Sequence, residues 1–182
     1  CYAAYLTPQG RMIADLWVYE LGDVILLGMH AAVKDTVLAK LDQFIFSEDV
    51  QLGDVSSTFA TLSVLGPSAG TAVADALGLA SSAPAGLELH GNVRAVFRGQ
   101  AAILLRPDDL GVAGFDLLVE TTLLEPLVAE LLARGAVEAD DEVAETLRIE
   151  GGVPKFHQDM DEETIPLEAG IEGRAISLTK GC

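Results

Sequence analysis

The sequence has few basic residues and almost no cysteine. Eleven Lys and Arg residues face 28 Asp and Glu residues, which gives a formal net charge of −17. Nucleic-acid-binding surfaces and anionic membranes both depend on Lys and Arg for attraction, so neither kind of partner is expected. Cys1 and Cys182 stand at opposite ends of the chain, which excludes a disulfide-rich scaffold and a four-ligand zinc site. We therefore expect a protein of the reducing cytoplasm.

Long hydrophobic runs are also missing. The strongest apolar stretch, 24–33, is interrupted by Gly28 and His30 and falls short of the ~18 residues that a membrane span requires. No basic segment followed by an apolar one is present, so no signal peptide is predicted. The chain begins with Cys and stops directly after Lys180-Gly181-Cys182, which leads us to expect a fragment cut at both ends.

The residues that are present can nevertheless form a sizeable core. Half of the 182 residues are hydrophobic, 21% are charged, and the mean hydropathy is +0.36, which excludes wholesale disorder. A chain of this length buries roughly 70% of its unfolded surface, so it needs no metal or disulfide for stability. One domain or two small subdomains are expected.

Hydrophobic periodicity predicts a mixture of strands and helices. A hairpin is expected from strand 11–20, a turn at Gly22-Asp23 and strand 24–29. Further predicted strands are 50–57, 58–65, 87–90, 93–97, 101–106 and 115–119; predicted helices are 31–46, 67–77, 122–133 and 140–150. Hairpins outnumber strand–helix–strand crossovers, and this pattern predicts an α+β fold with mainly antiparallel sheets and packed helices.

Two aspartates lie inside predicted strands, where Asp is a poor β former. Asp15 stands between Ala14 and Leu16, and the simplest interpretation is a carboxylate that faces solvent. Asp116 stands in the apolar strand 115–119. If both carboxylates converged on a cavity, they could bind an amino-pyrimidine ring through paired donors or take part in proton transfer.

Arg148 lies among apolar residues at the end of the predicted helix 140–150. A buried guanidinium must be paired with a carboxylate or a ligand anion, because an unpaired one costs several kcal/mol. An internal salt bridge to Glu150 or Asp116 and a role in ligand binding remain open alternatives.

The remaining polar groups carry weaker signals. The acidic segments 138–145 and 159–163 lack the spacing of a calcium loop, so a solvated surface is the preferred interpretation. The three histidines, His30, His90 and His157, have no partner at helical spacing, so no metal site is assigned. Lys180 can favour the thiolate of Cys182, but no catalytic triad can be argued from its position.

Six segments, in chain order, resemble the YgfZ-type folate-binding family, whose relatives include the glycine-cleavage T-protein (aminomethyltransferase). The resemblance covers essentially the whole chain. The segments are AAYLTPQGRMIADL at 3–16, LSVLGP at 62–67, GFDL at 114–117, LRIEGGVP at 147–154, DMDEETIPLE at 159–168 and TKGC at 179–182. The last resembles the start of the Lys-Gly-Cys-Tyr-x-Gly-Gln-Glu signature of the YgfZ branch.

The chain departs from the family pattern at its ends and at one internal position. It lacks the usual N-terminal strand and helix with a Thr-Asn-Asp motif, and everything after the signature cysteine. Asp116 stands where the T-protein usually has Glu. The resemblance implies a fold like the folate-binding domain of aminomethyltransferases. It further implies a partial first folate-binding subdomain at 1–49 and 147–182, and a second α+β subdomain at 50–146.

The resemblance also implies a ligand, tetrahydrofolate or a derivative, held in a central cavity. Asp15 matches the acidic position that contacts the pterin and supports aminomethyl transfer. Asp116 would be the second pterin-facing carboxylate, and Arg148 matches the arginine of the folate site. Cys182 matches the signature cysteine, linked in the YgfZ branch to iron–sulfur enzyme maintenance and tRNA modification, so Asp15 and Cys182 are the expected catalytic residues.

Three functions follow as hypotheses. The leading one is a folate-binding accessory protein of YgfZ type, cytoplasmic, with an iron–sulfur client protein as partner. The alternative is an aminomethyltransferase that moves a one-carbon unit from a carrier-protein-bound aminomethyl group to tetrahydrofolate. A third is a structural module without ligand, which would leave Asp15, Asp116 and Arg148 apart on the surface.

Overall fold

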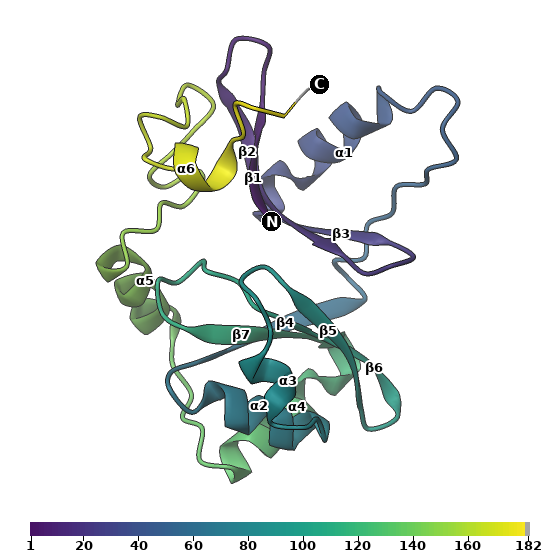
Figure 1. The fold of residues 1–182 in the computed structure, drawn as a ribbon, viewed down its shortest axis with the longest axis vertical. Helices are drawn as coiled ribbons and strands as arrows, with labels where there is room; N and C mark the ends of the chain where they lie inside the picture. Colours follow the sequence, from purple (N-terminus) through teal and green to yellow (C-terminus); the bar gives the residue numbers. More distant parts are fainter. Residues whose placement is uncertain (181–182) are drawn as a thin grey trace. The chain divides into compact units, whose positions relative to one another are not determined.

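The computed structural model describes residues 1–180, which form two compact units (Figure 1). The first unit comprises residues 1–19, 24–53 and the described residues from 154 onward; the second comprises residues 20–23 and 54–153. Each unit combines antiparallel strand pairs with helices. The predicted α+β fold class is therefore confirmed.

The sheet of the first unit has the order β1-β2-β3, with β1 at Tyr2–Leu6, β2 at Met12–Glu20 and β3 at Ile25–Gly28. β2 is the central strand, and its residues 12–16 are all buried. Alternation of buried and exposed residues is lost when both faces of a strand are covered. For this reason the prediction that Asp15 faces solvent is wrong.

Short helices complete the first unit: η1 at Ala31–Val33, α1 at Lys34–Asp42 and α6 at Glu172–Ala175. They pack with β1, β2 and the 156–171 segment around one core, which includes Met12, Ala14, Val37, Phe156 and Ile171. Segments from both halves of the sequence therefore pack over the hydrophobic face of β2.

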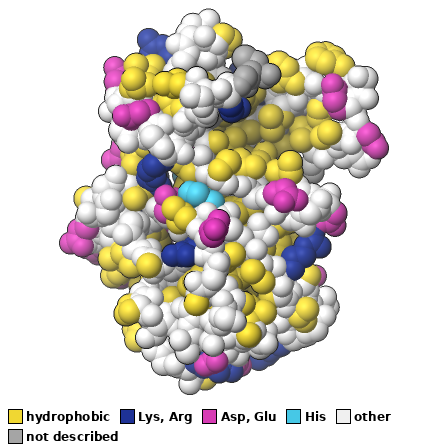
Figure 2. Space-filling view, in the orientation of Figure 1, with side chains coloured by type: hydrophobic (Ala, Val, Ile, Leu, Met, Phe, Trp, Pro, Cys, Tyr) yellow, Lys and Arg dark blue, Asp and Glu magenta, His cyan; other side chains and the backbone are white. Residues whose placement is uncertain are grey.

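The segment after α1 differs from the prediction. The expected helix 31–46 ends at Asp42, and the expected strand 50–57 is irregular. Its large apolar side chains are exposed instead of packed: Phe44, Phe46, Val50, Leu52 and Val55. Figure 2 shows hydrophobic side chains gathered on the surface over α1. Hydrophobic residues in this stretch predicted a strand, but a strand requires a pairing partner that the unit does not offer.

The second unit is built on a four-stranded sheet of order β4-β7-β6-β5. The strands are β4 at Phe59–Leu65, β5 at Asn92–Phe97, β6 at Gln100–Leu105 and β7 at Gly114–Glu120. The helical segments are α2 at Ala69–Leu77, α3 at Ser82–Ala85, η2 at Thr121–Leu123, α4 at Leu124–Ala133 and α5 at Asp141–Glu150. The expected strand 87–90 is irregular and ends in a turn, in which His90 has a φ of +60°.

The core of the second unit lies between the sheet and α2 and α4, which cover the same face of it (Figure 1). Fully buried side chains come from each layer: Val73, Leu104, Leu117, Val119 and Leu127. β7 is flanked by strands on both sides, and its residues 114–117 are all buried. Within residues 1–180, no helix is long and apolar enough to cross a membrane.

Candidate functional site

Asp15 lies on the central strand of the first unit and is only 3% exposed. Its Oδ2 accepts a hydrogen bond of 3.0 Å from the hydroxyl of Tyr2. The register of β1 and β2 places Tyr2 opposite Trp17, so Asp15 is its diagonal neighbour across the strands. Long aromatic side chains can span this diagonal, and here the phenol reaches the carboxylate.

The environment of Asp15 contains groups that raise the pKa of its carboxyl group and groups that lower it. Burial raises the pKa of the carboxyl group, while the hydrogen bond from Tyr2, its own backbone N–H and the charge of His30 lower it. Desolvation is the largest of these effects. The result is a carboxylate that is poorly hydrated and oriented by one donor, which suits it to accept further N–H donors from a ligand or to take a proton.

Tyr2 is itself held by two other side chains. Its ring lies 5.2 Å from that of Trp17, at an interplanar angle of 48°, and the guanidinium of Arg174 lies 5.0 Å from its ring centroid. Sequence reasoning missed both Tyr2 and Arg174. Tyr2 reaches Asp15 through the strand register, and Arg174 reaches Tyr2 from a helix more than 150 residues away in the chain. No local sequence pattern predicts either contact.

Asp116 occupies a comparable position in the second unit. It is 9% exposed on β7 and stands directly opposite Ser63 on β4. The Ser63 hydroxyl donates a hydrogen bond of 2.6 Å to its Oδ1. Burial, reinforced by the nearby charge of Asp109, raises the pKa of Asp116 to about 6, while the Ser63 bond opposes the rise. This carboxyl group can therefore exchange a proton close to neutral pH.

Arg148 is 6% exposed on α5, and its carboxylate partner is Glu145. Nε and Nη2 donate to the two Glu145 oxygens at 2.9 and 2.5 Å, and Nη1 donates to the carbonyl of Val153. The sequence predicts Glu150 or Asp116 as the salt-bridge partner, whereas the structure shows Glu145. Residues three apart lie on the same helix face, but residues two apart do not.

Two glycines bring the loop before β7 against the end of α5. A Cβ added at Gly111 would lie 2.5 Å from the Gly151 Cα, and one added at Gly151 would lie 2.6 Å from the Gly111 Cα. Gly111 also has a φ of +67°. This backbone contact anchors the loop that carries Asp109, whose charge acts on Asp116, to the helix that carries Arg148.

The predicted site residues are thus distributed over both units. Asp15 belongs to the first unit, and Asp116 and Arg148 belong to the second. Cys182 lies outside the described residues. The convergence of these side chains on one cavity stays a prediction.

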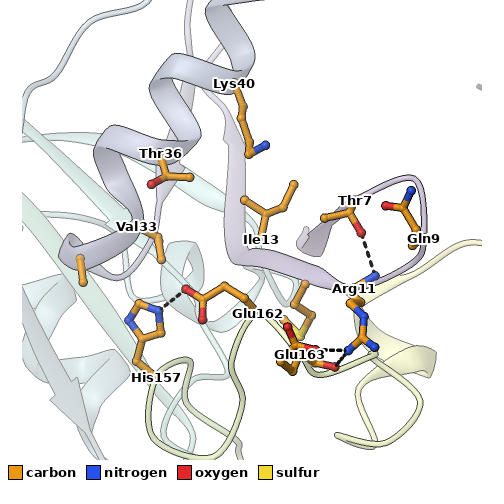
Figure 3. Close-up of a pocket in the computed structure, with 12 residues that line it drawn as sticks. Thr7, Gln9, Arg11, Ile13, Val33, Thr36, Lys40, His157, Glu162 and Glu163 are labelled. Atoms are coloured by element: carbon orange, nitrogen blue, oxygen red, sulfur yellow. Dashed lines mark hydrogen bonds and ion pairs between the residues drawn. The ribbon is translucent and has the colours of Figure 1, made fainter.

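A pocket of about 510 Å³ opens within the first unit (Figure 3). Its walls come from the β1–β2 turn, α1 and the 157–163 segment, and its lining residues do not include Asp15. Arg11 pairs with Glu163 at 2.8 Å, and His157 with Glu162 at 2.9 Å. The pocket is lined by Thr7, Gln9, Arg11, Met12, Ile13, Ala32, Val33, Thr36, Lys40, His157, Glu162 and Glu163.

The structure brings together polar groups that look isolated in the sequence. His30 and His157 meet edge to face with ring centroids 6.0 Å apart, and His157 has a φ of +66°. Asp161 accepts hydrogen bonds from the Glu163 N–H and the Thr164 hydroxyl, so part of the 159–163 segment organises its own loop. Among residues 1–180, no group of three or more His, Cys, Asp or Glu side chains is placed to hold a metal ion.

Comparisons with known proteins agree on one family. The family model of the GCVT N-terminal domain matches residues 1–180. An aminomethyltransferase of Xanthomonas axonopodis pv. citri is 34% identical over 183 residues, covering 99% of this chain and 49% of the relative. An aminomethyltransferase of Nostoc sp. is 28% identical over 190 residues, with coverage of 99% and 49%.

A solved structure supports the same assignment at the level of fold. The glycine cleavage system aminomethyltransferase T of Bartonella henselae matches with a TM-score of 0.78 and 22% identity, over 94% of this chain and 46% of that one. The chain spans about half the length of the curated relatives that it matches. Because the family model covers nearly every residue, this chain belongs to the GCVT N-terminal domain family.

Proposed function

We propose that this chain is the folate-binding part of an aminomethyltransferase-type protein and that its ligand is tetrahydrofolate. Family membership and the names of the relatives support the proposal. The observation that carries it is the environment of Asp15, a carboxylate 3% exposed and oriented by the Tyr2 hydroxyl. Such a group has lost most of its hydration, so it favours a ligand that supplies N–H donors.

The chemistry of a folate suits each of the two buried carboxyl groups taken by itself. A pterin offers an amino group and ring N–H donors, which carboxylates such as Asp15 and Asp116 accept. A folate tail offers carboxylates, which suit a guanidinium, but that of Arg148 already donates to both oxygens of Glu145. Asp116 has a pKa of about 6, so it can face the ligand either as an acceptor or, when protonated, as a donor. Its side chain is one methylene shorter than the Glu usual at this position in the T-protein.

The activity we propose for the whole protein is transfer of a one-carbon unit from a carrier-protein-bound aminomethyl group to tetrahydrofolate. In this reaction two nitrogens of tetrahydrofolate would bond to the one-carbon unit, its bonds to the amino group and the carrier would break, and ammonia and the protonated carrier would leave. Asp15 would bind the pterin and assist the transfer of the protons that the folate nitrogens release. Two relatives that carry the name aminomethyltransferase match nearly all of this chain, and this favours the enzyme over the accessory protein.

Calorimetry with tetrahydrofolate on the full-length protein tests the proposal. We expect saturable binding, weakened about tenfold to a hundredfold by Asp15→Asn, because the variant loses a charge-assisted hydrogen bond. Asp49→Asn, on an exposed residue, is the matched control and should bind as the natural protein does. Absence of binding at millimolar ligand would refute the proposal, as would full affinity in Asp15→Asn.

A folate-binding accessory protein of YgfZ type is the second candidate. The segment Thr179-Lys180-Gly181-Cys182 favours it, because it resembles the start of that branch's signature. The iron–sulfur client and the role of Cys182 remain predictions. Two assays separate the candidates: Asp15→Asn should abolish glycine-cleavage turnover in an aminomethyltransferase, whereas Cys182→Ser should impair iron–sulfur-dependent tRNA modification in cells if the protein is of YgfZ type.

The third hypothesis, a structural module without ligand, required Asp15, Asp116 and Arg148 to lie on the surface. Their exposed fractions are 3%, 9% and 6%, so none of them is a surface residue. Arg148 pairs with Glu145, but burying the carboxyl group of Asp15 costs stability, and a ligand that donates to this group gives a reason for that cost. We therefore favour a ligand-binding function over a structural one.

A further inference from the structure

Three side chains from distant parts of the sequence form a chain of contacts in the first unit. Arg174 of α6 lies over the ring of Tyr2 on β1, with its guanidinium carbon 5.0 Å from the ring centroid. The hydroxyl of Tyr2 donates to Asp15 of β2 across 3.0 Å. Arg174 thus contacts the face of the Tyr2 ring, and the hydroxyl on the same ring donates the hydrogen bond to Asp15.

A cation over an aromatic ring attracts the electrons of that ring. In tyrosine this draws electron density away from the oxygen and makes the O–H a stronger hydrogen-bond donor. Hydrogen bonds to an ionised acceptor are roughly twice as strong as neutral ones, so the ionised form of Asp15 gains more than the protonated form. We propose that Arg174 is a positioning residue that acts through Tyr2 to keep Asp15 ionised and its carboxylate oriented.

The surroundings of Asp15 oppose its ionisation, and the Tyr2 hydroxyl favours it. Burial is the largest influence on the carboxyl group and raises its pKa, and the Tyr2 hydrogen bond is the first of the influences that lower it. His30, after β3, adds a smaller lowering through its charge. Trp17, opposite Tyr2 on β2, packs against the ring at 5.2 Å and holds it in place. Arg174 is therefore the cation placed to strengthen the Tyr2 donor.

The test is a titration of the Asp15 side-chain carbon by ¹³C NMR in the ligand-free, full-length protein. Arg174→Met and Arg174→Gln should both move its midpoint to higher pH, and Arg174→Lys, which retains a cation, should restore most of the natural value. Arg98→Met is the matched control, because Arg98 lies 5.5 Å over the ring of Phe97 in the second unit. Arg98→Met removes the same kind of contact and should leave the titration midpoint of Asp15 unchanged.

A double variant tests whether the effect passes through Tyr2. Tyr2→Phe keeps the ring but removes the hydroxyl, so it should itself raise the midpoint, and adding Arg174→Met should then change the titration of Asp15 no further. An equal shift from Arg174→Met in both backgrounds would mean that the arginine acts directly through space. That result, or an unchanged titration in Arg174→Met and Arg174→Gln, would overturn the proposal.

The effect on a ligand rests on the proposed function and is measured separately. Above the titration midpoint, Arg174→Met should weaken tetrahydrofolate binding about twofold to fivefold, the range typical of an exposed cation–π contact. If the natural protein binds no tetrahydrofolate, the proposed function fails, while the titration of Asp15 still decides the role of Arg174. If it binds and Arg174→Met retains full affinity above the midpoint, the arginine does not orient Asp15 for the ligand.

Discussion

Asp15 and Asp116 are two buried carboxyl groups with different hydrogen-bond partners. Each lies on a strand between two others, and each accepts one hydrogen bond from a hydroxyl, Tyr2 for Asp15 and Ser63 for Asp116. Only Asp116 also feels a neighbouring acid, Asp109, and its pKa reaches about 6. Burial raises the pKa of both groups, so each carboxyl group is less acidic than that of an exposed Asp.

The elevated pKa of Asp116 predicts a pH-dependent loss of stability. An Asp in the unfolded chain has a pKa near 3.8, so the folded chain binds this proton more tightly. Its contribution is fully present below pH 3.8 and is lost as the pH rises through about 6. Asp116→Asn should remove this dependence and raise the free energy of unfolding at pH 7 by up to about 3 kcal/mol.

Urea unfolding of the natural protein and of Asp116→Asn, between pH 4 and pH 7, measures the effect. The difference between the two curves isolates Asp116 from other groups that titrate in the same range. Asp49→Asn, at an exposed position, should run parallel to the natural protein. A difference that stays constant with pH would contradict the assignment of the titration to Asp116.

At the scale of elements, the contact between Gly111 and Gly151 joins the loop before β7 to the end of α5. Neither glycine has room for a Cβ, because the other backbone lies within 2.6 Å of that position. The helix itself begins with a clear local signal, since Asp140 caps it by accepting from the Val143 N–H at 3.0 Å. Its start could be predicted from sequence, but its contact with the loop could not.

Gly111→Ala should destabilise the protein by about 2–5 kcal/mol. About 1–2 kcal/mol comes from a side chain at positive φ, and about 1–3 kcal/mol from overpacking against Gly151. Gly152→Ala is the matched control, because Gly152 has a φ of +64° but no atom within 4 Å of the added Cβ. In thermal or urea unfolding, Gly152→Ala should lose only the ~1–2 kcal/mol that positive φ costs. Equal losses of stability in both variants would exclude the close contact between Gly111 and Gly151.

At the scale of the whole molecule, charge decides which partners are excluded. The net charge is −17 with only eleven basic residues, so phosphate backbones are repelled. We expect no saturable binding of tRNA to this chain in a filter-binding assay at ~150 mM salt. A measurable affinity there would contradict the expectation and would favour a direct role in tRNA modification over an indirect one.

The sequence by itself determined the class of fold. Periodicity predicted most strands and helices. The resemblance at 3–16 and 147–154 led to the YgfZ-type family and its T-protein relatives, and the comparisons support the GCVT N-terminal domain that the T-protein relatives share. Strand 50–57 was predicted wrongly because apolar residues favour a strand only where a neighbour offers hydrogen bonds, and here they lie exposed. Local patterns describe one segment at a time, so they cannot identify a missing partner.

Only the tertiary structure decided the environments of the candidate residues. Asp15 is buried because β2 is covered on both faces, and it is bonded because the register sets Tyr2 on its diagonal. Arg148 pairs with Glu145, while Arg174 reaches Tyr2 from the far end of the chain. The burial and the hydrogen-bond partners of a residue depend on the groups that folding places next to it. Burial and partners in turn govern the charge and the reactivity of its side chain.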